Sequence, residues 1–112
     1  MTGNPSYNKK VITAHSSGDR SLELALALGM SHEQFARARL LMISVSKHRR
    51  WRSQRSPHGL MIDCVYLVAK SNGIKTSAEK IVVLTREIFG IGTQPLPNKW
   101  KKDFVEEIEE YV

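Results

Sequence analysis

The middle of the chain carries a dense run of positively charged side chains. No Asp or Glu interrupts it between residues 37 and 55, and one tryptophan stands inside it. Its members are Arg37, Arg39, Lys47, Arg49, Arg50, Trp51, Arg52 and Arg55. Closely spaced guanidinium groups attract phosphate oxygens and suit bidentate contacts with them. The run therefore predicts a surface for a phosphate-bearing polyanion.

Trp51 is open to two interpretations. Its indole ring can stack on a base, which would favour single-stranded nucleic acid. Alternatively the ring folds back as an apolar cover on the helical body of the protein. The second interpretation is favoured, because a fully exposed indole is costly in water.

A second basic cluster lies near the end of the chain, at the start of the last predicted helix. Positive charge at this end of a helix opposes the helix dipole. A bound anion would relieve the conflict; alternatively the acidic residues later in the same helix balance it. Together with the mid-chain run, the predicted nucleic-acid contacts are Lys47, Arg49, Arg50, Trp51, Arg52, Arg55, Lys99, Lys101 and Lys102.

The residue types give little support to catalysis or metal binding. The histidines His15, His32, His48 and His58 are scattered over different predicted elements, without the spacing of zinc ligands. The Gly-Ile-Gly motif at residues 90–92 is too short for a phosphate-binding loop. We expect no catalytic residue, no metal, no cofactor and no small-molecule substrate.

Two further residues stand out because they lie inside the apolar run 60–69. Asp63 is the only charged side chain there. We expect a structural role for it, either paired with a base such as Arg86 or facing water at the helix margin. Cys64 is the only cysteine of the chain, so it forms no intramolecular disulfide. We interpret it as a small core side chain in a reducing compartment.

The net charge of +6 is unevenly spread over the 112 residues. Residues 103–112 hold five acidic residues and no base, so all 17 bases and only six acids belong to the rest of the chain. A basic body with an acidic end favours nucleic acid as the partner. An anionic membrane surface is a weaker alternative, and a solvated surface without any partner is the third.

Polar residues dominate positions 1–20, and no signal peptide is visible there. The longest apolar run is far shorter than the ~20 residues that a membrane-spanning helix needs. We therefore expect a soluble, intracellular protein, in the cytoplasm or with the nucleic acid of the cell. Residues 1–19 lack a sustained period and predict a flexible arm, followed by one helical domain over residues 20–112.

Hydrophobic periods and capping signals predict five helices and no strand. The second begins at a Ser-x-x-Gln capping box, and the third between Ser56-Pro57 and Asn72-Gly73. The third is apolar nearly all round, which is typical of a buried central helix. A further capping box starting at Thr76 opens the fourth. The predicted ranges are 21–28, 31–48, 57–71, 76–89 and 98–111, which make an all-α bundle.

The stretch from Arg55 to Ile81 resembles the centre of a cyclin-box repeat, in the form found in transcription factor B and its eukaryotic relative TFIIB. In that family a Ser-Pro or Arg-Ser pair opens an apolar central helix that holds a late aromatic residue. A short polar linker and a Thr-x-x-Glu helix start follow. The matching positions are Arg55, Ser56, Pro57, Tyr66, Leu67, Lys70, Gly73, Thr76 and Glu79, with Lys80 inserted before Ile81.

The resemblance implies a five-helix cyclin-like fold and a role related to transcription, with proteins of the transcription machinery as possible partners. The chain has room for one repeat, where the family carries two, and it lacks the cysteines of the family's zinc ribbon. The connection after the fourth helix, residues 89–99, is also longer than the family's short Gly-Val turn. The long connection argues against promoter recognition by a helix-turn-helix.

Two functions from different classes follow. The first is a non-enzymatic module that binds nucleic acid, with DNA as the expected polymer, and serves transcription and its regulation. The second is a protein-interaction adaptor of cyclin-like fold, which binds a partner peptide or helix. The acidic last helix would suit a basic partner in the second case.

Overall fold

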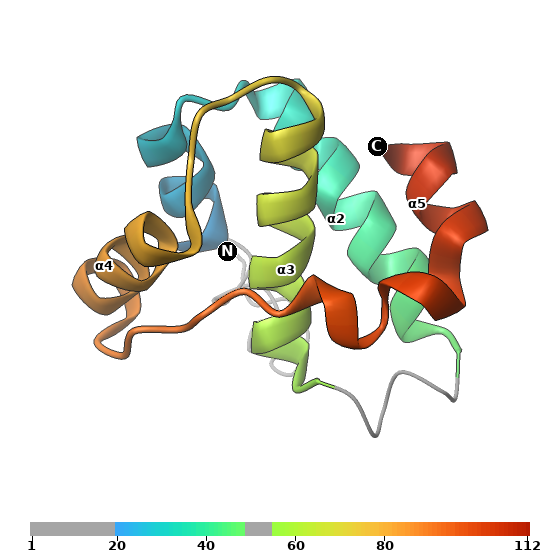
Figure 1. Ribbon diagram of the computed structural model, residues 1–112. Helices are drawn as coiled ribbons and strands as arrows, with labels where there is room; N and C mark the ends of the chain where they lie inside the picture. Colours follow the sequence, from blue (N-terminus) through green and yellow to red (C-terminus); the bar gives the residue numbers. More distant parts are fainter. Residues whose placement is uncertain (1–19, 49–54) are drawn as a thin grey trace, which may run out of the picture.

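The computed structural model describes residues 20–48 and 55–112. Within these ranges the chain forms five α-helices, two short 3-10 turns and no strand, so the predicted all-α bundle is confirmed (Figure 1). A first helix covers residues 20–28. The others are α2 His32–Ser46, α3 Pro57–Ser71, α4 Ala78–Phe89 and α5 Val105–Tyr111, with the turns η2 Pro97–Lys99 and η3 Lys101–Phe104 before α5.

The helix α3 is the buried centre of the molecule, as predicted. Its start is fixed locally, because the Ser56 hydroxyl accepts a hydrogen bond from the Gly59 amide at 3.1 Å and Pro57 takes the first helical position. Ten of its 15 residues are buried. A helix that is apolar on nearly every side must be covered by neighbours on nearly every side. It therefore dictates the arrangement of the rest.

The neighbours of α3 lie on both sides of it (Figure 1). The helix α2 packs against α3 and also against α5 on one side. On the other side lie α4 and the helix over residues 20–28, which are joined where the Arg20 guanidinium donates to the Ile88 carbonyl. The segment between α4 and η2 then crosses in front of the N-terminal half of α3.

Local capping explains where α2 and α4 begin and end. The capping box predicted at Ser31 and Gln34 is present, with N–H···O distances of 2.9 and 3.1 Å. The capping box predicted from Thr76 to Glu79 does not form, because Ser77 is the N-cap and its hydroxyl accepts from the amide of Lys80, a residue with no side-chain acceptor to complete a box. Gly90 ends α4 as expected, at a φ of 86° that few other residues adopt.

The last predicted helix is interrupted. We expected a continuous helix over residues 98–111, but the chain forms η2 and η3 and becomes α-helical only at Val105. Trp100 and Phe104 interrupt it, because their φ values of −130° and −129° lie outside the helical range. Both side chains are almost fully buried, and their rings meet edge to face at 6.0 Å. The backbone there forms 3-10 hydrogen bonds instead of the α-helical pattern, such as that from the Asp103 amide to the Trp100 carbonyl at 3.0 Å.

Candidate functional site

A buried carboxylate organises the region that carries the second basic cluster. Asp63, in the middle of α3, is fully buried. Its Oδ2 accepts from Arg55 Nε at 3.0 Å and from Trp100 Nε1 at 2.8 Å. Its Oδ1 accepts from Arg55 Nη2 at 3.1 Å and from the Leu96 amide at 2.7 Å. A buried carboxylate is tolerable only when paired and hydrogen-bonded in this way.

The sequence suggested a base such as Arg86, or water, as the partner of Asp63. The partner is Arg55, whose side chain is only 15% exposed. Its Nη2 also donates to the Gln94 carbonyl at 2.9 Å. Arg55, predicted as a nucleic-acid contact, thus directs its guanidinium toward an internal carboxylate. Its visible role is to join the start of α3 to the segment after α4.

The hydrogen bonds of the Arg55–Asp63 pair also fix the path of residues 94–100. The Gln94 carbonyl, the Leu96 amide and the Trp100 indole are all bonded to the Arg55–Asp63 pair. Pro95 and Pro97 between them are buried. Because proline has a restricted φ, the segment has few alternative paths once its ends are held. Residues 94–100 therefore form a rigid segment beside the exposed part of α3, which we call the wall.

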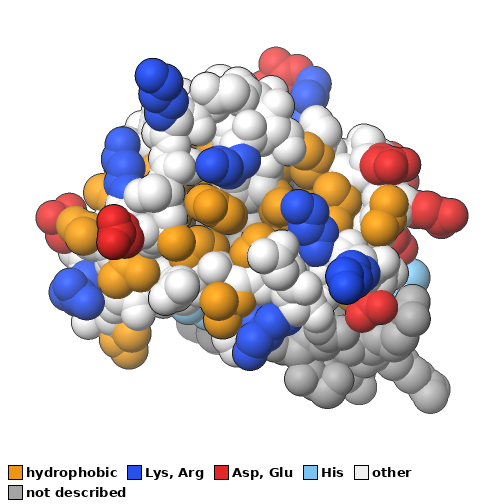
Figure 2. Space-filling model, viewed as in Figure 1, with side chains coloured by type: hydrophobic (Ala, Val, Ile, Leu, Met, Phe, Trp, Pro, Cys, Tyr) orange, Lys and Arg blue, Asp and Glu red, His pale blue; other side chains and the backbone are white. Residues whose placement is uncertain are grey.

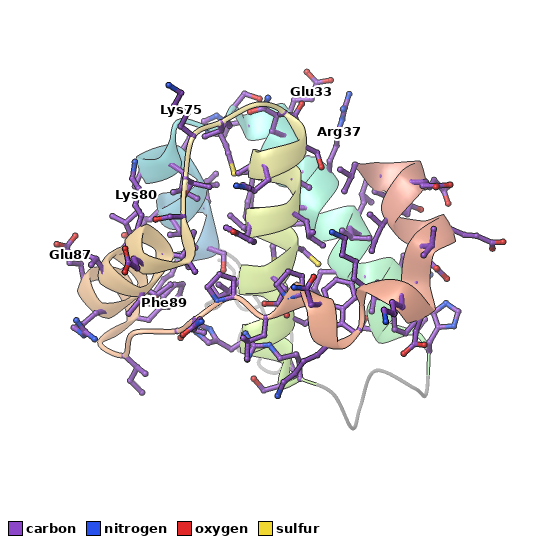
Figure 3. All side chains as sticks on the ribbon, viewed as in Figure 1. Glu33, Arg37, Lys75, Lys80, Glu87 and Phe89 are labelled. Carbon is purple, nitrogen blue, oxygen red and sulfur yellow. The ribbon has the colours of Figure 1, made fainter. Side chains whose placement is uncertain are left out.

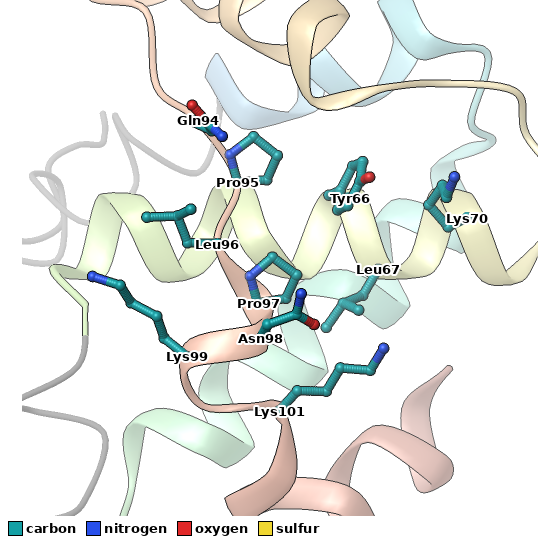
Figure 4. Close-up of a pocket in the computed structure, with 10 residues that line it drawn as sticks. All are labelled: Tyr66, Leu67, Lys70, Gln94, Pro95, Leu96, Pro97, Asn98, Lys99 and Lys101. Carbon is teal, nitrogen blue, oxygen red and sulfur yellow. The ribbon is translucent and has the colours of Figure 1, made fainter.

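A groove lies between this wall and α3 (Figure 4). Its volume is about 420 Å³. Tyr66, Leu67 and Lys70 of the groove come from α3, and the other lining residues come from the wall and from η3. The lining residues are Tyr66, Leu67, Lys70, Gln94, Pro95, Leu96, Pro97, Asn98, Lys99 and Lys101.

The described residues that line the groove carry positive charge, and none of them is a carboxylate. Lys70, Lys99 and Lys101 are all exposed, and they come from two different parts of the fold. The Lys70 ammonium lies 5.9 Å from the centroid of the Tyr66 ring, at the outer range of a cation–π contact. Figure 2 shows Lys and Arg side chains standing around the apolar surface of this face, with most acidic side chains toward its edges. The groove can therefore attract an anion and offer it several ammonium donors.

The structure brings some of the predicted contacts together. Lys99 and Lys101 line the groove, and Lys102 lines an adjoining hollow of about 340 Å³ with Lys101 and Val105. Lys47, at the end of α2, is exposed and lines neither of them. Arg49, Arg50, Trp51 and Arg52 lie outside the described residues.

Tyr66 and Lys70 were not predicted as contacts, although the sequence holds a signal for them. They are four residues apart, so they share one face of α3, and together with Ser71 they are the residues in the second half of this helix that are not fully buried. Tyr66 is partly buried, and Lys70 is exposed. Polar residues with helical spacing on an otherwise apolar helix mark the side that the other elements leave open.

His48 and Arg55, which flank the stretch 49–54 in the sequence, both contact this same C-terminal part. His48 Nε2 lies 2.8 Å from Glu107 Oε2, and the His48 ring lies 5.3 Å from that of Phe104. Arg55, on the other side, is bonded to Asp63 and Gln94. Both residues thus contact the chain close to the segment that carries the groove lysines Lys99 and Lys101.

Two groups with perturbed pKa values lie outside the groove. The pKa of His58 is lowered by burial and by the nearby Arg55 cation. Its Nε2 lies 3.2 Å from Thr93 Oγ1, and its ring meets Phe89 edge-on at 4.8 Å. Burial, and then the Asp63 charge, raise the pKa of the Cys64 thiol well above its usual value. A thiol held protonated in the core is a poor nucleophile.

Among residues 20–48 and 55–112, no three His, Cys, Asp or Glu side chains gather closely enough to hold a metal ion. In the same part of the chain, no helix has the length and apolar character required to cross a bilayer. Comparison with models of protein families, with curated proteins and with solved structures finds no match to the chain.

Proposed function

We propose that this protein is a non-enzymatic module that binds nucleic acid through the lysine-lined groove beside α3. The observation that carries the proposal is the convergence of Lys70, Lys99 and Lys101 on one groove that holds no carboxylate. Ammonium groups that contact phosphates release condensed counterions, which is the main source of sequence-independent affinity for nucleic acid.

The rigidity of the groove favours this function over a merely solvated surface. The backbone that carries Lys99 and Lys101 is held by the Asp63 contacts at Leu96 and Trp100. Side chains on a fixed backbone lose less freedom when they bind, so more of the contact energy appears as affinity. Lysines on a loosely held loop would lack that advantage.

The proposal keeps the prediction from the sequence that the mid-chain arginines also contact the polyanion. Arg49, Arg50 and Arg52 follow His48 and precede Arg55, and both of these flanking residues contact the C-terminal part of the fold. DNA as the polymer, a role in transcription and an intracellular location complete the proposal. The last three points are supported by composition and by the cyclin-box resemblance alone.

A fluorescence-anisotropy titration with labelled DNA tests the proposal. Replacing Lys99 and Lys101 by Ala should lower the slope of log K against log salt concentration by about two, one for each lost phosphate contact. Replacing Lys75 and Lys80 by Ala removes the same charge outside the groove (Figure 3) and should alter the slope less. No binding by the unaltered chain at about 50 mM salt, or equal losses in both variants, would contradict it.

A second candidate, the protein-interaction adaptor, is favoured by one apolar feature. Ile91 is 70% exposed and lines a hollow of about 290 Å³ with His58, Phe89 and Thr93. Such a hollow suits one apolar side chain of a partner helix or peptide. Capture of a defined protein after nuclease treatment should then fail with Ile91→Asp and persist with Val83→Asp, which alters another exposed apolar residue.

A further inference from the structure

The lining of the groove falls into three chemical zones. Leu67 on α3 and the two wall residues Pro95 and Pro97 are buried, and together they form the apolar inner surface of the groove, which we call its floor. The three lysines supply positive charge, and the amides of Gln94 and Asn98 each offer a donor and an acceptor. A ligand that satisfies all three zones has a flat apolar face, a hydrogen-bonding edge and an anionic group.

We infer that the groove holds one unpaired nucleotide of a single strand, an assignment that rests on the proposed function. The base stacks on the Tyr66 ring above the floor, its edge faces the amides, and its phosphates lie at Lys99 and Lys101. A hollow of about 420 Å³ is the size of a site for a small molecule. An unpaired base can enter it, since its faces and edge are free.

Duplex DNA fits the shape of the groove less well. The stacked bases of a duplex expose only their edges, and reading them requires an element that protrudes into the major groove. Here the cations surround a hollow whose floor is apolar, so a duplex would contact the rim and leave the floor empty. An acidic peptide would likewise use the lysines and leave the base-sized floor unused.

Tyr66 is the residue that distinguishes these ligands. It lies one turn before Lys70 on α3, and its partly buried ring lines the groove on the side opposite the wall (Figure 4). Stacking requires the ring and not the phenol hydroxyl. The assignment therefore predicts different results for Tyr66→Phe, which keeps the ring, and Tyr66→Leu, which removes it.

The test is a pair of anisotropy titrations, one with a labelled single-stranded oligonucleotide and one with a blunt duplex of the same sequence. We expect tighter binding of the single strand. Tyr66→Leu should weaken single-strand binding about 5- to 10-fold, as expected for one lost stacking contact, and Tyr66→Phe should change it by less than about twofold. Tyr111→Leu is the matched control on α5, outside the groove. Thermal unfolding followed by circular dichroism checks that every variant is folded.

Each of the other outcomes overturns the inference. Equal or tighter binding of the duplex, or equal effects of Tyr66→Leu and Tyr111→Leu, would overturn the unpaired nucleotide and leave the proposed function standing. Binding of neither oligonucleotide would overturn both. Capture of a poly-glutamate peptide in that last case would indicate an acidic protein segment as the occupant.

Discussion

The indole Nε1 of Trp100 donates a 2.8 Å hydrogen bond to Oδ2 of Asp63, which lies 37 residues earlier in the chain. The same oxygen accepts from Arg55 Nε at 3.0 Å. One buried carboxylate thus joins Arg55, two residues before α3, to the middle of α3 and to the C-terminal segment. The groove exists because these three parts are held together, so its stability and its proposed binding function depend on the same contact.

Replacing Asp63 by Asn should destabilise the protein strongly. The substitution leaves Arg55, which is 15% exposed, without its counter-charge, and loss of one partner of a buried pair costs about 3 kcal/mol or more. The free energy of unfolding, measured by urea denaturation, checks this. Glu33→Gln is the control, because Glu33 and Arg37 form an exposed pair at 3.7 Å (Figure 3) whose loss should cost less than about 0.5 kcal/mol. Similar losses in both variants would show that the buried pair contributes little.

A substitution at Gly59 should act through Arg55. A Cβ at Gly59 would lie 2.7 Å from Arg55 Cζ and 2.9 Å from its Nε, so the guanidinium would have to shift, which would disturb its hydrogen bonds with Asp63. Gly59→Ala should therefore destabilise the protein, although alanine favours a helix by up to about 1 kcal/mol over glycine. In a chain that already carries Arg55→Met and Asp63→Asn, the same substitution should become neutral or stabilising. Urea denaturation of the four variants measures the change of sign, and an unchanged sign would exclude this coupling.

The Cys64 thiol should be inert in the folded protein. It is fully buried, and its pKa is raised, so the reactive thiolate is scarce. We expect a thiol reagent such as an aromatic disulfide to label it only after urea unfolds the chain. Ser71→Cys, at the exposed end of the same helix, should add one thiol that reacts at once. Rapid labelling of Cys64 without urea would mean that the core around α3 opens readily.

Stability should fall in mild acid, partly because of His58. Its folded pKa is lowered from 6.5, so below that value the unfolded chain binds more protons at His58 than the folded chain does. The contribution is therefore complete above pH 6.5 and is lost as pH falls through the folded pKa. His58→Gln should lose less stability than the unaltered chain between about pH 7.5 and pH 5, as measured by urea denaturation. Parallel pH profiles would assign the acid sensitivity to other groups.

Local signals predicted the helices that carry the site. The bounds of α3 were predicted correctly, because Ser56, Pro57 and Asn72-Gly73 act within one turn of the helix ends. The last helix was predicted wrongly in its first half. Its interruption depends on the contact of Trp100 with Asp63, which joins distant parts of the chain and leaves no mark in local periodicity.

The candidate site was predictable in charge and not in shape. The sequence alone shows the positive charge of Lys99 and Lys101. Their closeness to Lys70 depends on how residues 94–100 cross α3, which the sequence does not show. The inward orientation of the Arg55 side chain could not be predicted from the sequence for the same reason. From the sequence, an arginine in a basic run is expected at the surface. The structure shows that Arg55 instead pairs with Asp63, which is buried eight residues later on α3.

The most direct test of the central claim is a nuclear magnetic resonance titration of the labelled protein with a short single-stranded oligonucleotide at low salt. We expect the largest amide shifts at Tyr66, Lys70 and residues 94–101, together with any signals from the mid-chain arginines. Shifts confined to α4 and the acidic face of α5, or no shifts at all, would contradict it.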